Sequence, residues 1–155
     1  MRKWRSAAGG SARIRGSSMV EFAFVAALLI FLLLGIMEMG FMMSNTLTLS
    51  NAAFEGARVA SMGRSVQDVQ DAINRATSSL NPEYLSAPIF EAKRFGPGYN
   101  WQAWVPGTTR PGGNNSQIRV TLSYNYHYIT GSALGALSRS AQPDQRVIRR
   151  QAVVR

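Results

Sequence analysis

The chain has 155 residues and a formal net charge of +9, and it contains no cysteine and one histidine, His127. This length suits one small domain together with a membrane span. The lack of cysteine excludes a disulfide framework and a thiolate metal site, and a single histidine cannot form a metal cluster or a paired catalytic base.

Residues 1–16 form a basic leader without an acidic residue. Its glycines and serines cannot bury a core, so we expect it to lack fixed structure. It carries five of the chain's 17 Lys and Arg residues, which leaves 12 basic against 8 acidic residues, a net +4, in the remainder. The excess charge belongs to the leader, so we expect no nucleic-acid partner. Positive charge before a first span stays inside the cell, which predicts a cytoplasmic N-terminus.

Residues 17–43 predict a transmembrane helix. From Phe22 to Met43 the only charge is Glu38, and a helix of this length, ~33 Å, matches the hydrocarbon core of a bilayer. A soluble protein with a buried apolar helix and a cleaved secretory signal are the alternatives, but the run is too uniformly apolar for the first and too long for the second. For Glu38 we expect either snorkelling toward headgroups or a polar contact with another subunit.

The junction between leader and span reads GSSMVEF from Gly16 to Phe22 and resembles a prepilin-peptidase site. The resemblance implies cleavage between Gly16 and Ser17, which would leave Glu21 as the fifth residue of the mature chain. Glycine has no side chain, so a protease can approach its carbonyl closely. A carboxylate beside an apolar helix is costly to bury and needs a partner. The resemblance implies that this partner is the new α-amino group of a neighbouring subunit.

Residues 44–62 continue the helical pattern beyond the span. Glu55 and Arg58 are three positions apart and can pair on one helix face. Gly56 and Ala57 lie between them and allow another backbone to approach closely. We favour packing of this segment against the chain's own β domain, and packing between subunits is the alternative.

Two blocks of this long helix together resemble the TadE-like family, which are pseudopilins of the tight-adherence (Tad, or Flp-type) pilus system. The first block is Gly16 followed by VEFA at residues 20–23, and the second is AAFEGAR at residues 52–58. Related pseudopilins called TadF share much of this design, and the C-terminal half carries no family motif. The resemblance implies as partners a prepilin peptidase, other pilins or pseudopilins, and inner-membrane pilus assembly proteins.

The remaining sequence predicts a short helix and a small antiparallel sheet in an exported domain of residues 44–155. Ser65 and Asp68 form a capping box, an apolar stripe runs to Leu80, and Asn81-Pro82 ends the helix. The predicted strands are residues 89–95, 99–105, 117–129 and 145–154, with a loop at 106–116 and an irregular or briefly helical segment at 131–143. The third strand alternates apolar and polar residues, which is typical of a half-buried antiparallel strand. The fold class is therefore α+β.

Six aromatic residues occur in or near these strands, and we favour a role in the core over a carbohydrate or nucleic-acid surface. They are Tyr99, Trp101, Trp104, Tyr124, Tyr126 and Tyr128. No catalytic set, metal cluster or phosphate loop is visible in the sequence, so we expect no enzyme activity and no cofactor.

The sequence therefore predicts a minor pseudopilin that takes part in assembling a Tad/Flp-type pilus. It is expected in a bacterial inner membrane with a periplasmic C-terminal domain, and incorporation into the pilus is a further option. In this interpretation Phe22 and Glu38 contribute to lateral packing of the apolar helices. The alternative is a single-span exported binding module that is never processed.

Overall fold

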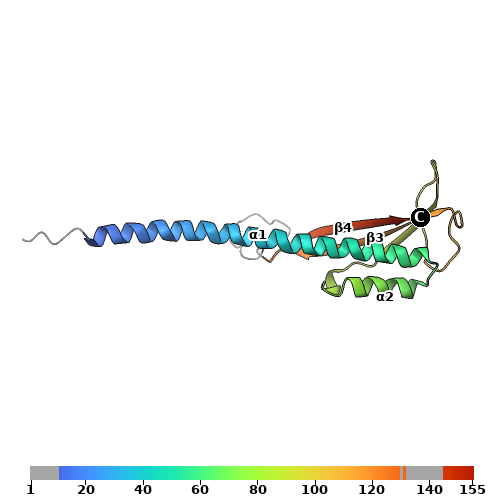
Figure 1. The fold of residues 1–155 in the computed structure, drawn as a ribbon, viewed down its shortest axis with the longest axis horizontal. Helices are drawn as coiled ribbons and strands as arrows, with labels where there is room; N and C mark the ends of the chain where they lie inside the picture. The colour runs from blue at the N-terminus through green and yellow to red at the C-terminus, as the bar shows by residue number, and fades with distance from the viewer. Residues whose placement is uncertain (1–10, 130, 132–144) are drawn as a thin grey trace, which may run out of the picture. The chain divides into compact units, whose positions relative to one another are not determined.

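The computed structural model describes residues 11–129, 131 and 145–155, and it forms two units, residues 1–37 and residues 38–155 (Figure 1). The expected irregular segment at 131–143 lies outside the described residues except for Gly131, and so do the first ten residues of the leader. The fold is α+β, as predicted, with a long N-terminal helix, a second short helix and an antiparallel sheet.

Helix α1 runs without a break from Ser11 to Ser61. It begins six residues before the expected start at residue 17, so the second part of the leader is helical and the expectation of no fixed structure is wrong there. Alanine, arginine and isoleucine tolerate a helix well, and these residues extend it. Residues 38–43, which we expected within the span, belong to the second unit.

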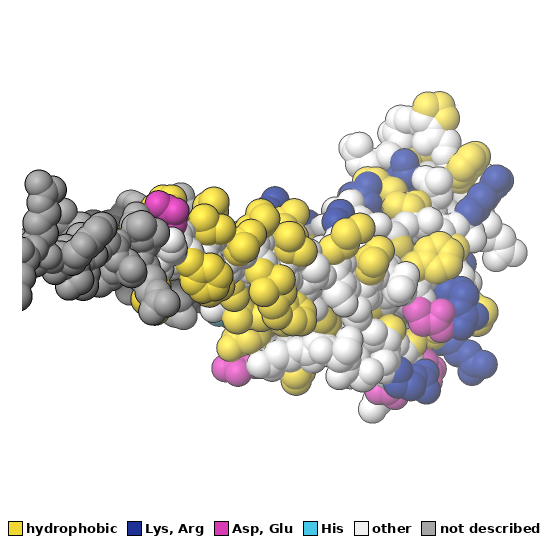
Figure 2. Space-filling view, turned by 60° about the vertical axis from the view of Figure 1, so that its left-hand side comes forward, with side chains coloured by type: hydrophobic (Ala, Val, Ile, Leu, Met, Phe, Trp, Pro, Cys, Tyr) yellow, Lys and Arg dark blue, Asp and Glu magenta, His cyan; other side chains and the backbone are white. Residues whose placement is uncertain are grey.

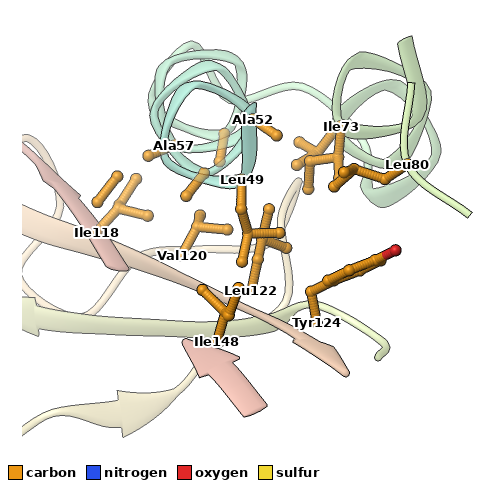
Figure 3. Packing of buried hydrophobic residues seen from close by; sticks show 14 of the residues in the cluster. Leu49, Ala52, Ala57, Ile73, Leu80, Ile118, Val120, Leu122, Tyr124 and Ile148 are labelled. Atoms are coloured by element: carbon orange, nitrogen blue, oxygen red, sulfur yellow. The ribbon is translucent and has the colours of Figure 1, made fainter. Parts of the chain in front are cut away.

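The second half of α1 is a packing helix built from small side chains. Leu49 and four alanines of this half are completely buried, namely Ala52, Ala53, Ala57 and Ala60. They face the sheet and helix α2, as Figure 3 shows for Leu49, Ala52 and Ala57. Alanine favours the helix and leaves room for a close approach of the two layers.

Helix α2 spans Val66–Ala76 and has the predicted capping box between Ser65 and Asp68. It ends four residues earlier than the apolar stripe indicated. The Thr77 hydroxyl donates to the Ile73 carbonyl, and the two serines that follow also compete with the helical hydrogen bonds. Leu80 is nevertheless buried, at 6 % exposure, so the stripe identified the core correctly and the helix length wrongly. A short 3-10 helix, η1, follows at Pro82–Tyr84.

The described residues form a four-stranded antiparallel sheet in the order β2-β1-β3-β4. The strands are β1 (Ile89–Arg94), β2 (Gln102–Ala103), β3 (Ser116–His127) and β4 (Gln145–Val154). Strand β4 has the predicted bounds, whereas β2 has two residues instead of the predicted seven. The short β2 is bounded by Gly98 before it and by Pro106 after it, and both residue types weaken strands.

Strand β3 alternates as predicted. Its apolar side chains are buried from Ile118 to Tyr126, and Figure 3 shows Ile118 and Val120 on the side of the sheet that faces the helices. Arg119, between them, is half-buried. Thr121 is an exception because it belongs to the polar set and is 5 % exposed.

The six aromatic residues divide between the two environments. Trp104, Tyr124 and Tyr126 are buried in the core, whereas Tyr99 is 46 % exposed. Trp101 is half-buried, and the guanidinium of Arg119 lies 3.8 Å from its ring centroid. The core interpretation therefore holds for the first three, and Tyr128 is partly buried against the core. It fails for Tyr99, because that residue follows a glycine-rich turn and lies outside the strands.

Candidate membrane anchor and assembly site

The first half of α1 is apolar and exposed. Between Phe22 and Met37 every side chain is exposed except Ala26, which is half-buried. In the part of the chain that the structure describes, this is the one helix long and apolar enough to cross a membrane, and its most apolar stretch has no buried residue. Figure 2 shows hydrophobic side chains covering its surface. A helix satisfies its own backbone hydrogen bonds, so a bilayer can solvate these side chains.

The expected processing site lies near the start of this helix. Gly16 and Ser17 are part of α1, and Glu21 follows about one turn later with an exposed side chain. A peptide bond inside a helix must unwind locally before a protease can cleave it. Glycine is the weakest helix former after proline, so its position makes local opening easier at this bond.

Glu38 is buried against the chain's own β domain. The Tyr126 hydroxyl donates to Glu38 Oε1 at 2.6 Å, and the backbone N–H of Ile129 donates to the same oxygen at 3.3 Å. The residue is only 9 % exposed. Within the chain the carboxylate is therefore held by intramolecular donors and does not extend freely as a snorkelling side chain would. A contact with another subunit stays a prediction.

Glu21 and Glu38 flank the exposed apolar stretch of α1 in the sequence. An unpaired Glu38 carboxylate beside such a stretch would be costly to bury. Two donors from β3 and its extension shield it. Burial, and then the hydrogen bond with Glu38, raise the pKa of the Tyr126 hydroxyl, so Tyr126 remains a donor.

The second motif block packs within the exported domain. A Cβ atom added to Gly56 would lie 2.8 Å from Ile73 Cγ1 on α2 and 3.7 Å from Val120 Cγ1 on β3. Ala57 is completely buried. Glu55 and Arg58 form the expected ion pair at 2.6 Å, and both side chains are exposed, at 38 % and 47 % respectively. The small residues of the block thus join α1 to its own domain, and the charged residues stay at the surface.

Arg110 contributes to the end of α1, and sequence reasoning missed it. Its Nη2 atom donates to the backbone carbonyls of Ala60, at 3.3 Å, and Ser61. A cation at a helix C-terminus satisfies orphan carbonyls and opposes the helix dipole. The loop at 106–116 had been identified from composition alone, and no local signal in it indicates a partner about fifty residues away.

The described residues contain no group of three or more His, Cys, Asp or Glu side chains that could hold a metal ion. The features brought together by the structure are those of an anchor and a packing surface. They are the exposed apolar helix, the carboxylate at each end of it, and the small-residue block in its outer half.

Comparison with known proteins identifies the same part of the chain. Residues 16–58 match the family model described as TadE-like protein. The match begins at Gly16, contains both motif blocks and ends at Arg58, so the predicted resemblance is confirmed over this segment. No curated protein and no solved structure matches the chain. The family suggests a protein associated with a Tad pilus, anchored in a membrane by its N-terminal helix.

Proposed function

From the TadE-like match over residues 16–58, we propose that the protein is a minor pseudopilin that takes part in assembling a Tad/Flp-type pilus. The observation that carries this proposal is the start of the match at Gly16, directly before an exposed apolar helix with Glu21 at its first turns. A glycine, a carboxylate and a lipid-length apolar helix in this order suit a peptidase substrate that remains in the membrane after cleavage.

The proposed topology places the N-terminus in the cytoplasm and residues 38–155 in the periplasm. The basic residues that precede the apolar stretch support this orientation. The exported part has a hydrophobic core that includes both helices and the sheet. It therefore has the packing that a domain without disulfides needs.

In the proposed mechanism a prepilin peptidase cleaves between Gly16 and Ser17, and the apolar helices of neighbouring subunits then pack side by side. Glu21 lies near the new terminus and pairs with the α-amino group of a neighbour. Phe22, which is 74 % exposed, begins the apolar surface that these contacts would cover. The protein is a substrate and a structural component in this scheme, with no enzyme activity of its own.

The test is the N-terminal mass of the membrane-extracted protein, measured with and without a co-expressed prepilin peptidase. We expect loss of residues 1–16 only when the peptidase is present, and no loss in a Gly16→Leu variant. Gly35→Leu is the matched control, because a Cβ at Gly35 meets no neighbouring atom within 4 Å, and this variant should be cleaved normally. An intact leader in the wild-type chain with an active peptidase would reject the proposal.

A retained leader would favour the alternative of an unprocessed, membrane-anchored binding module. The specific observation on its side is a half-buried cluster in which Lys93 Nζ lies 4.9 Å and the Arg119 guanidinium 3.8 Å from the centroid of the Trp101 ring. Aromatic rings with cations beside them also occur in ligand-binding surfaces. Pull-down of envelope components with the wild-type chain and with a Trp101→Ala variant would then be the next measurement.

A further inference from the structure

Strand β4 lies at one edge of the sheet, and no described residue adds a strand beyond it. The order β2-β1-β3-β4 places β3 on one side of it. Its pairing with β3 is uninterrupted, from His127 opposite Gln145 to Ile118 opposite Val154. The strand contains no proline, glycine or bulge, and these are features that protect a free edge. A long, regular edge of this kind can accept a further strand.

The register shows which backbone groups of β4 point away from the sheet. The N–H of Ser86, just before β1, donates to the Ser123 carbonyl at 2.9 Å, so the backbone groups of Ser123 point toward β1. This direction alternates from one residue to the next in an antiparallel pair, so the even-numbered residues of β3 bond to β4. Their partners in β4 are also even-numbered. The backbone groups that point outward are therefore those of Val147, Arg149, Gln151 and Val153.

The same strand is strongly basic. It carries Arg146, Arg149 and Arg150, all three exposed, and neither β4 nor β3 contains an acidic residue. Ser123 and Leu122 lie opposite Arg149 and Arg150 on β3, so neither arginine has a charged cross-strand partner. The ion pairs of the described residues lie on α1 and between β1 and β3. The positive charge of this edge therefore has no counter-charge within the sheet.

The arginines disfavour a second copy of the chain as the added strand. In the central registers, two β4 strands related by a two-fold axis would place Arg149 opposite Arg149, Arg150 opposite Arg150, or Arg146 opposite Arg150. Like charges directly opposite each other destabilise a strand pair, whereas opposite charges stabilise it. Charge complementarity therefore favours an acidic strand at this edge.

We propose that the free edge of β4 binds an extended acidic segment of a partner protein, which joins the sheet as an antiparallel strand. The backbone of this segment bonds to the outward-pointing groups of β4. Two adjacent acidic residues lie opposite Arg150 and Arg149, one on each face of the sheet, and two apolar residues follow opposite Ile148 and Val147. The proposal goes beyond the proposed function and does not depend on leader processing.

The experiment measures binding of a synthetic peptide to the full chain in micelles of a non-ionic detergent. The peptide has about ten residues, the length of β4, with two adjacent glutamates followed by two valines, threonine elsewhere and a neutral fluorophore. We expect saturable binding by fluorescence anisotropy, and binding about ten-fold weaker when lysine replaces both glutamates. A dissociation constant of the glutamate peptide above about 1 mM would overturn the proposal.

N-methylated peptides separate strand addition from charge attraction alone. Methyl groups on the peptide nitrogens opposite Val147 and Arg149 remove the donors that face β4 and block the hydrogen bonds. Methyl groups on the alternate nitrogens point away from the sheet. The two peptides have the same charge and composition. We expect the first to lose binding and the second to bind as the unmethylated peptide does, and equal binding of the two would reject strand addition.

A charge exchange tests where the partner's acidic residues lie. Arg149→Glu should weaken binding of the glutamate peptide about ten-fold, because an attractive cross-strand pair becomes repulsive. Arg75→Glu is the matched control, since Arg75 is exposed on α2 and its reversal changes the net charge equally. A peptide with lysine opposite position 149 should bind Arg149→Glu more tightly than the wild-type chain. Circular dichroism verifies that both variants fold, and equal effects of the two reversals would contradict the proposed register.

Analytical ultracentrifugation of the same samples tests the second copy as occupant. Gln151→Pro removes one outward N–H of β4, and proline is tolerated at such edge positions. We expect this variant to lose peptide binding and to keep the mass of the wild-type chain. A wild-type dimer that Gln151→Pro dissociates, together with no peptide binding, would assign the edge to a second copy and overturn the proposal.

Discussion

The two halves of α1 have the same secondary structure and opposite surroundings. From Phe22 to Met37 large apolar side chains are exposed, whereas Leu49 and the alanines from residue 52 to residue 60 are completely buried in the domain. The difference lies in side-chain size. Large side chains all round a helix suit a fluid solvent of lipid chains, whereas one face of small side chains suits a fixed protein partner.

The largest expected loss of stability is that of Leu49→Ala, and Leu47 on the same helix is its matched control because the two leucines differ in burial. Leu49 is 0 % exposed and Leu47 is 56 % exposed. Leu49→Ala should lower the free energy of unfolding of the exported domain by about 2–5 kcal/mol through lost burial and a cavity. Leu47→Ala should change it by less than about 0.5 kcal/mol, as is usual for surface positions. Denaturant unfolding of the full chain in micelles measures both, and similar losses would contradict the assignment of the buried face.

The next prediction concerns the hydrogen bond to Glu38, the first residue after the exposed half of α1, and its contribution to the stability of the domain. Tyr126→Phe removes the hydroxyl that donates to the buried carboxylate at 2.6 Å. Hydrogen bonds to charged groups contribute about 1.5–3 kcal/mol, so the domain should lose stability of this order. Tyr99→Phe, on a residue that is 46 % exposed, is the control and should leave the unfolding midpoint unchanged. An unchanged midpoint for Tyr126→Phe would show that the contact does not hold the domain to α1.

Gly56 and Gly40 allow the two halves of the comparison to be tested by adding one methyl group to a packed glycine and to an open one. Gly56→Ala places a methyl group 2.8 Å from Ile73 Cγ1, and overpacking of this kind destabilises a core by about 1–3 kcal/mol. Gly40→Ala adds the same methyl group where nothing lies within 4 Å, and it should not destabilise the chain. Combining Gly56→Ala with Ile73→Ala removes both clashing atoms, Cγ1 and Cδ1, so the double variant should be less unstable than the sum of the two single variants. A double variant that is as unstable as the sum of the two single variants would show that the contact with Ile73 is not the cause.

Local sequence patterns were sufficient to predict much of this fold. The alternation in β3, the capping box of α2 and the bounds of β4 follow from side-chain periodicity and backbone chemistry, which are properties of neighbouring residues. The length of α2 was overestimated, because Leu80 belongs to the apolar stripe but Thr77 ends the helix. The stripe indicates which residues are buried, and it does not indicate where backbone hydrogen bonding stops.

The contacts that join distant segments could not be predicted. Tyr126 and Glu38 are 88 positions apart, and Arg110 is about fifty positions from the carbonyls that it binds. Nothing near Glu38 in the sequence distinguishes a carboxylate that awaits another subunit from one that is satisfied within its own chain. Only the register of β3 against α1 decides between these possibilities, and the register is a property of the whole fold.

The smallest expected effect on stability belongs to the ion pair of the second motif block. Glu55 and Arg58 are exposed and lie on the surface of α1, away from the buried Gly56 and Ala57. Exposed pairs are screened by solvent and add little to stability, so Arg58→Ala should shift the unfolding midpoint within experimental error. The same variant should be compared with the wild-type chain for pilus assembly in cells. If assembly fails while stability is unchanged, the pair acts in a contact with another subunit, and the block serves two purposes, with its small residues facing inward and its charges outward. If assembly also proceeds normally, the pair is a surface feature of the helix, and the packing of Gly56 and Ala57 alone accounts for the physical role of the block.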